Sequence, residues 1–246
     1  MRRHQFMVKG KTKTMKPSQV AKATGEVRVP EDCSTLEAAV NRIRKLRRMT
    51  TIVLGPGTHR IDGNYLYLTS ALSIVGRPNA PKESIVILGG INLKKKMKGT
   101  CHLQHLTLRQ AKGCGVFGQS SFTMDDVLVD HCGGSGVVAN GTGVVGRCTN
   151  VEVRQCGCSG VRANHGASIL LLGAQTTVHH NSTNGKSGEY GLCVYGMFVN
   201  MYLLLWLVVL WLVGSAGNCG WYNLMDLDTP NPNVVVVVVV VVVFHM

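Results

Sequence analysis

Residues 106–118, LTLRQAKGCGVFG, residues 127–139, VLVDHCGGSGVVA, and residues 151–163, VEVRQCGCSGVRA, are three versions of one motif. A fourth and longer version starts at Thr176 and reaches the matching glycine at Gly191. The starts of the four versions lie 21, 24 and 25 residues apart, counted as 127 − 106, 151 − 127 and 176 − 151. Repeats of this length are typical of proteins built from stacked, similar turns of chain.

Each motif begins with a short apolar triplet, passes through a glycine and continues with a second apolar pair. A third strand signal precedes the triplets at 121–124, 143–148 and 167–172. Three short strands in 21 to 25 residues describe one coil of a solenoid. We therefore predict an all-β fold, a right-handed parallel β-helix of roughly six coils.

The alternation within the triplets sets the direction of the side chains. It points the first and third residues of each triplet into the core and points Thr107 and Glu152 outward, whereas Leu128 requires a covering loop. Small residues recur in aligned rows, so Cys132 and Cys156 are expected as neighbours about 4.8 Å apart. The nine cysteines are odd in number and no secretory signal is visible, which favours a ladder of buried thiols over a disulfide.

The sequence before the repeats predicts a cap. Val27–Val29 reads as a strand, and residues 34–49 read as an amphipathic helix with Leu36, Ala39, Val40, Ile43 and Leu46 on its apolar face. Ser34 is the expected N-cap, with Glu37 completing a capping box.

These segments resemble the right-handed parallel β-helix (pectin-lyase-like) superfamily. VRVP at 27–30, STLEAAV at 34–40 and TIVLGPGT at 51–58 are similar to its capping strand, helix and first coil, and the likeness covers residues 26–196. The resemblance implies the fold, but the superfamily includes polysaccharide lyases, hydrolases, binding modules and uncharacterised proteins.

The two ends of the chain differ from the repeats. Residues 1–25 carry seven Lys or Arg and no acid, which predicts a basic flexible tail. Residues 197–246 form a hydrophobic, low-complexity tail with an apolar run at 197–213 and ten valines at 234–243. Three interpretations of this tail stay open: a reading-frame artefact, a membrane segment at 197–213, and a cover for the open end of the solenoid.

Polar residues also stack when the motifs are aligned. One row contains Arg109, Asp130, Arg154 and His179, and the next contains Gln110, His131, Gln155 and His180. A third row contains Gln119, Asn140 and Asn164. Two adjacent polar rows could bind an extended polymer by repeated hydrogen bonds, so we expect a non-catalytic binding or scaffold module for a glycan or a protein.

The alternative is a polysaccharide-active enzyme, a lyase or hydrolase, that uses Asp126, Asp130 and Arg154. A lyase would add Ca²⁺, which takes six to eight oxygen ligands, yet residues 101–196 contain only five acids. Arg154 is expected to pair with Asp130, and Asp125 and Asp126 are expected to point to opposite sides of a strand. The same reasoning separates His179 from His180, so no metal site is predicted.

The remaining expectations concern partners. The net charge of +13 comes from residues 1–100, which hold 20 Lys or Arg against 6 acids, so the repeats themselves predict no nucleic-acid partner. The lysine run 94–98 is expected in a solvated loop that could meet an anionic partner. We further expect a monomer inside the cell, with membrane attachment through 197–213 as the alternative.

Overall fold

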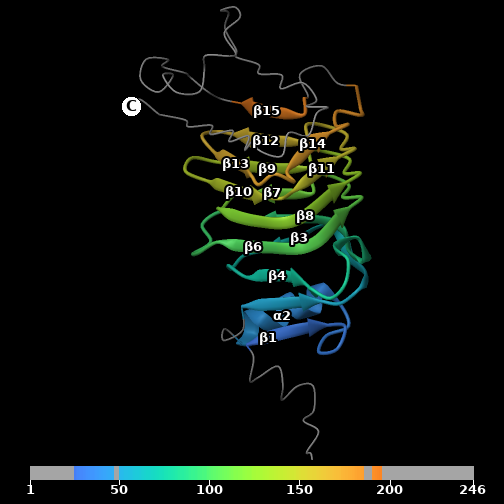
Figure 1. Ribbon diagram of the computed structural model, residues 1–246. Coiled ribbons are helices and arrows are strands. Elements are labelled where there is room, and N and C mark those ends of the chain that lie inside the picture. Colours follow the sequence, from blue (N-terminus) through green and yellow to red (C-terminus); the bar gives the residue numbers. More distant parts are fainter. Residues whose placement is uncertain (1–24, 47–49, 186–189, 196–246) are drawn as a thin grey trace, which may run out of the picture.

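A computed structural model of the chain describes residues 25–46, 50–185 and 190–195. This part of the chain is a parallel β-solenoid of about six turns, in which each strand lies on the matching strand of the previous turn (Figure 1). The all-β parallel β-helix prediction is confirmed. The strands are β1 (Glu26–Val29), β2 (Thr51–Leu54), β3 (Gly57–Leu68), β4 (Ser73–Gly76), β5 (Ile85–Leu93), β6 (Cys101–Arg109), β7 (Val116–Gly118), β8 (Phe122–Asp130), β9 (Val137–Asn140), β10 (Val145–Thr149), β11 (Glu152–Arg154), β12 (Val161–Asn164), β13 (Ser168–Leu172), β14 (Thr177–His179) and β15 (Leu192–Tyr195).

The strand register follows the spacing of the sequence motifs. Leu106 of β6 pairs with Val127 of β8, and Val153 of β11 pairs with both Val129 of β8 and Val178 of β14. The second elements form their own stack, β7 on β9, β12 and β15. The third elements stack as β8, β10 and β13. The internal repeat therefore places each motif one strand above the previous one.

The core runs along the axis of the solenoid and is filled by the inward side chains of every turn. Large aliphatic residues fill the early turns, and the later turns combine valine, alanine and cysteine with a few large side chains such as Phe122 and Ile169. Cys132 and Cys156 are both buried, and they are free thiols like every other cysteine of the described residues. Their burial agrees with the predicted interior ladder.

One α-helix, α2 (Leu36–Leu46), follows β1 and covers that end of the core. Its N-cap is Thr35, whose Oγ1 accepts a hydrogen bond from the Ala38 N–H at 3.1 Å, so the prediction of Ser34 was wrong by one residue. Glu37 accepts a bond from the Asp62 N–H at 3.0 Å instead of closing a capping box. The apolar face is as predicted except for Leu46, which lies at the end of the helix and is exposed.

A short 3-10 turn, η1 (Lys82–Ser84), lies against β6 and β8. This turn covers the outer side of both strands, which is why the outward side chains Thr107 and Leu128 are buried. Leu128 is buried as the sequence predicted for a residue under a covering loop, and the Thr107 hydroxyl donates to the Lys82 carbonyl at 3.0 Å. The prediction that Thr107 faces outward is thus right in direction, but the side chain is covered.

Both predicted tails, residues 1–25 and 197–246, lie outside the described residues except for Gly25. Within the described ranges, α2 is too short for a membrane crossing, and no helix there meets the length and hydropathy of a membrane span.

Candidate functional site

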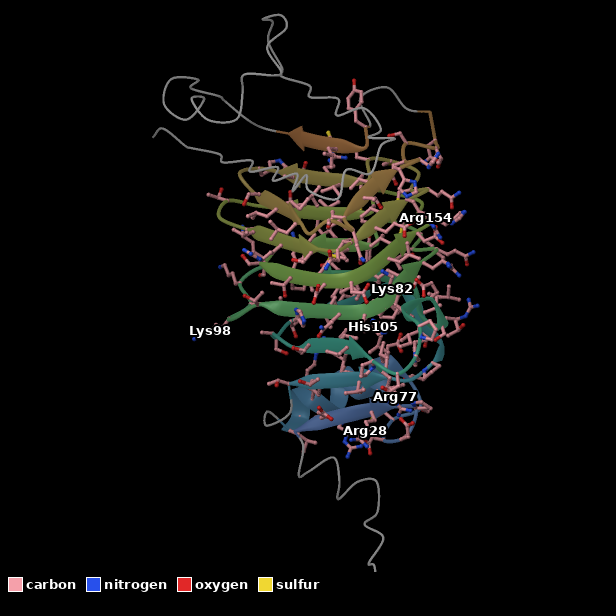
Figure 2. The ribbon with its side chains drawn as sticks, in the orientation of Figure 1. Arg28, Arg77, Lys82, Lys98, His105 and Arg154 are labelled. Carbon is pink, nitrogen blue, oxygen red and sulfur yellow. The ribbon has the colours of Figure 1, made fainter. Side chains whose placement is uncertain are left out.

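The edge where β6, β8, β11 and β14 end carries the first predicted polar row. Arg109 pairs in register with Asp130, which pairs with Arg154, which pairs with His179. Arg154 lies on the right edge of the solenoid in Figure 2. We call these four residues, together with Gln110, His131, Gln155 and His180, the corner ladder.

Asp130 is the centre of the corner ladder. Its side chain is only 4% exposed and receives three cationic or polar donors. Arg109 Nε lies 3.0 Å from Oδ2, Arg154 Nε lies 3.2 Å from Oδ1, and His131 Nδ1 lies 2.8 Å from Oδ1. The expected pairing of Arg154 with Asp130 is therefore present.

The network continues to the next turn through Glu152. Arg154 Nη1 lies 2.7 Å from Glu152 Oε1, and His179 Nε2 lies 3.4 Å from the same oxygen. Each of the two arginines thus has a carboxylate, and the two carboxylates balance the two arginines. The row offers hydrogen-bonding groups with little net charge.

The ionisation of these groups follows from their contacts. Burial alone would raise the pKa of Asp130, but hydrogen bonds from Arg154 and His131 outweigh it and hold the pKa below its ordinary value. Burial would lower the pKa of Arg154, and the bond to Asp130 and the charge of Glu152 raise it instead. Asp130 is a weakened base and Arg154 a weakened acid, which suits a structural ion pair better than proton transfer.

The second row of the corner ladder has an unusual backbone. Gln110, His131, Gln155 and His180 all have positive φ angles, between 50° and 54°, and all four are exposed. A left-handed residue at the end of each strand turns the chain sharply, and these polar side chains stand at that turn on successive coils. Their amides and imidazoles form a column of donors and acceptors about 4.8 Å apart.

The same turn corrects the prediction that His179 and His180 point apart. Their Nδ1 atoms lie 2.6 Å apart and their ring centroids 4.9 Å apart, in an edge-to-face arrangement. The alternation of a regular strand does not apply, because His180 has left-handed backbone angles. The two rings form one polar unit at the top of the described ladder.

A second carboxylate site lies elsewhere on β8, and the sequence reasoning missed its partners. Asp126 Oδ1 lies 2.6 Å from Lys82 Nζ, and Oδ2 lies 2.6 Å from His105 Nδ1. His105 Nε2 also donates to the Ala80 carbonyl at 2.8 Å. We call Lys82, His105 and Asp126 the clasp, because their contacts hold Ala80 and η1 against β6 and β8. Lys82 and His105 are labelled in Figure 2.

The clasp changes the expected role of the acids. Asp126 has a φ of 51°, so Asp125 and Asp126 both lie on the outer side of β8 rather than on opposite sides as predicted. Burial would raise the pKa of Asp126, but the bonds from Lys82 and His105 lower it. Asp126 and Asp130 share no bonding partner in these contacts.

His105 is the second cation of the clasp, beside Lys82. Both of its ring nitrogens face acceptors, and a neutral imidazole has only one N–H to donate. The bond to the Ala80 carbonyl raises the pKa of His105, burial lowers it, and Asp126 raises it, with a net upward shift.

The third predicted row lies at a different turn of the coil. Asn140 and Asn164 pair in register, and His165 Nδ1 lies 2.8 Å from Asn140 Oδ1. Arg162 Nε donates to Asn164 Oδ1 at 3.1 Å. This row is a separate polar surface and provides a comparison for the corner ladder.

No group of three or more His, Cys, Asp or Glu side chains in the described part of the chain could hold a metal ion. Comparisons of the chain with protein-family models, curated proteins and solved structures gave no match.

Proposed function

We propose that this protein is a non-catalytic binding module that holds an extended polymer, a polysaccharide first, along the corner ladder. The observation that carries this proposal is the column of exposed polar side chains Gln110, His131, Gln155 and His180, repeated once per coil. Regular spacing of donors and acceptors suits a ligand that is itself a repeat. The ion pairs of the buried Asp130 carboxylate with Arg109 and Arg154 tie the neighbouring coils together beside the column.

The charge of the corner ladder favours a neutral glycan over an acidic one. Arg109 and Arg154 are both engaged by carboxylates, which leaves little free positive charge for an acidic sugar. The exposed amides and imidazoles can instead exchange hydrogen bonds with sugar hydroxyls.

A polysaccharide lyase or hydrolase has less support. Asp126, Asp130 and Arg154 are each held by two or more partners, and the pKa of each carboxyl is lowered. A general acid for glycoside hydrolysis requires a raised pKa. Ca²⁺ would have to displace Lys82 and His105 from Asp126, or three donors from Asp130. The second ligand that we propose for the corner ladder is a protein.

The finer assignment to the pectin-lyase-like superfamily belongs to this proposal as well. Its support is the order of capping strand, helix and first coil at residues 26–58, together with the parallel stacking of the later coils. A function common to that superfamily does not follow, because its members share the fold and differ in chemistry.

The test uses the full chain and a panel of neutral and acidic oligosaccharides, with and without Ca²⁺. Mass spectrometry reads both retention on the protein and any new product. We expect saturable retention without product, and about tenfold weaker retention for Gln110→Ala/Gln155→Ala because each lost hydrogen bond contributes about 0.5–1.5 kcal/mol.

The matched control is Gln119→Ala/Asn140→Ala in the third row, which should leave retention unchanged. Shortened or unsaturated products that disappear in Asp130→Asn, while circular dichroism shows that the variant is folded, would favour the enzyme. If a folded sample neither retains an oligosaccharide nor forms a product, the proposal of a glycan ligand is overturned and a protein ligand is favoured.

A further inference from the structure

The edge of the solenoid opposite the corner ladder carries cations that, unlike Arg109 and Arg154, form no ion pairs with described carboxylates. Lys98 projects from the left edge in Figure 2, whereas Arg154 lies on the right. Six exposed cations come from this edge and from the end of α2 beside it. We call them the lysine edge: Arg44, Lys45, Lys94, Lys95, Lys96 and Lys98.

Direct contacts join the two segments of the lysine edge. A guanidinium nitrogen of Arg44 donates to the Tyr67 carbonyl at the end of β3. Lys94 Nζ lies 4.2 Å from the centroid of the Tyr67 ring. Tyr67 therefore brings the end of α2 and residues 94–98, which we call the lysine loop, onto one surface, although they are about fifty residues apart in the chain.

The lysine loop is anchored rather than free. Met97 packs against the core, and its N–H donates to Ser120 Oγ at 3.3 Å. The same hydroxyl donates to the Lys94 carbonyl at 2.8 Å. The backbone of the loop is thus fixed while its lysine side chains point into solvent.

The charge of the lysine edge is unbalanced. The carboxylates that form ion pairs within the described residues are Glu26, Glu31, Asp126, Asp130 and Glu152, and none of them pairs with a cation of this edge. The arginines of the corner ladder are used in ion pairs, whereas the six cations of the lysine edge form no ion pair with a described carboxylate, so their charge can attract an external anion.

Apolar groups accompany this charge. The large hydrophobic side chains exposed among the described residues are Leu46, Tyr67 and Val145, and the first two belong to this edge. Lysines beside an exposed leucine and tyrosine match the interface of an anionic bilayer, which attracts cations and accepts apolar and amphipathic side chains. A single-stranded nucleic acid fits less well, because Lys94 occupies the face of the Tyr67 ring on which a base would stack.

We propose that the lysine edge is a peripheral docking surface for an anionic lipid bilayer. The lysines and Arg44 face the lipid phosphates and carboxylates, and Leu46 and Tyr67 enter the headgroup region. This surface is independent of residues 197–213 and leaves the corner ladder exposed on the far edge, so a bound polymer and a membrane would not compete.

Vesicle flotation of the full chain tests the proposal, with phosphatidylcholine alone and with equal parts of phosphatidylserine and phosphatidylcholine. We expect binding only to the mixed vesicles, weakening as salt is added. Lys95→Gln/Lys98→Gln should weaken it about 25-fold, because each lysine at an anionic surface is worth about a factor of five.

The matched control, Arg60→Gln/Lys112→Gln, removes the same charge from exposed positions outside this edge and should bind like the unaltered protein. Leu46→Ser should weaken binding by about tenfold even in high salt, since the apolar part is not screened. Circular dichroism of each variant checks the fold.

Equal losses in both double variants would overturn the proposal, because binding would then follow net charge alone. Equal binding to the two vesicle types would overturn it in favour of the apolar segment 197–213. Loss of single-stranded RNA binding in Lys95→Gln/Lys98→Gln, with no vesicle binding by the unaltered chain, would replace the bilayer with a nucleic acid.

Discussion

Asp126 and Asp130 lie four residues apart on the same strand, and each is surrounded by basic side chains, yet they hold different parts of the molecule. The Asp130 side chain is 4% exposed and joins three consecutive coils through Arg109 and Arg154. The Asp126 side chain is 35% exposed and joins β8 to a crossing segment through Lys82 and His105. Asp130 joins three coils of the stack, whereas Asp126 joins two neighbouring coils to the segment that covers them.

The difference in exposure means that ion pairs of the same chemistry contribute more to stability at Asp130 than at Asp126. A buried carboxylate between two arginines separates charges that would otherwise repel, and its removal leaves them facing each other. A carboxylate that is 35% exposed, as Asp126 is, can be replaced at lower cost, because water already reaches the carboxylate itself.

The largest effect is therefore expected at Asp130. Asp130→Asn should lower the free energy of unfolding by about 3 kcal/mol, because it removes a buried charge that accepts bonds from Arg109, Arg154 and His131. Urea denaturation followed by circular dichroism measures this change.

Combining Asp130→Asn with Arg154→Gln tests whether the loss of stability comes from arginines left without a carboxylate. If the loss arises from uncompensated arginines, Arg154→Gln should cost little or even stabilise the protein in the Asp130→Asn background, although it is destabilising by itself. Additive losses would show that Asp130 and Arg154 act independently and would contradict the network.

The second effect, at Asp126, is expected to be smaller. Asp126→Asn should cost about 1 to 2 kcal/mol, because it weakens the bonds to Lys82 and His105 at a carboxylate that water already reaches. Its consequence is local: hydrogen exchange should rise in the segment around Ala80 and Lys82 before it rises in β11 or β12.

Asp125→Asn is the matched control, since Asp125 neighbours Asp126 but accepts only a 3.4 Å bond from the Gln104 amide. It should leave exchange near Lys82 unchanged. Equal exchange in the two variants would show that the clasp does not hold the crossing segment.

The sequence predicts the stacked rows well, because spacing alone determines which residues share a row. Arg109, Asp130, Arg154 and His179 lie in one register, as do Asn140 and Asn164. Alignment of the repeats suffices here because the strands that carry these residues, from β6 onward, pair without a register shift.

The contacts that were missed have a physical origin in the turns. Left-handed residues such as Asp126 and His180 interrupt the alternation of the strand, so neighbouring side chains lie on the same side. One signal was available: His105 and Asp126 lie 21 residues apart, which is the spacing of their motifs. Lys82 lies outside the repeats, and no spacing indicates that its segment crosses back over β6 and β8.

The smallest expected effect is on the pH dependence of stability, because a histidine with a raised pKa, His105, contacts Asp126 but not Asp130. The net upward shift of the His105 pKa means that its contribution to stability is complete below the unfolded-state value of 6.5 and is lost as pH rises through the folded-state pKa. The clasp should therefore weaken on the alkaline side by about 1 kcal/mol or less, the value of one hydrogen bond. Asp126 and Asp130 have lowered pKa values, so their contributions are lost only as pH falls below the ordinary value of 3.8.

Urea denaturation of the unaltered protein and of His105→Gln over a pH series measures the difference between them. The gap in unfolding free energy should be largest below pH 6.5 and should close as pH rises, because the glutamine side chain has no proton to lose in this range. A gap that stays constant with pH would mean that His105 is neutral, so that it donates to only one of the Ala80 carbonyl and the Asp126 carboxylate. The charged clasp would then reduce to the Lys82–Asp126 pair alone, and the contrast between the two carboxylates would be one of burial only.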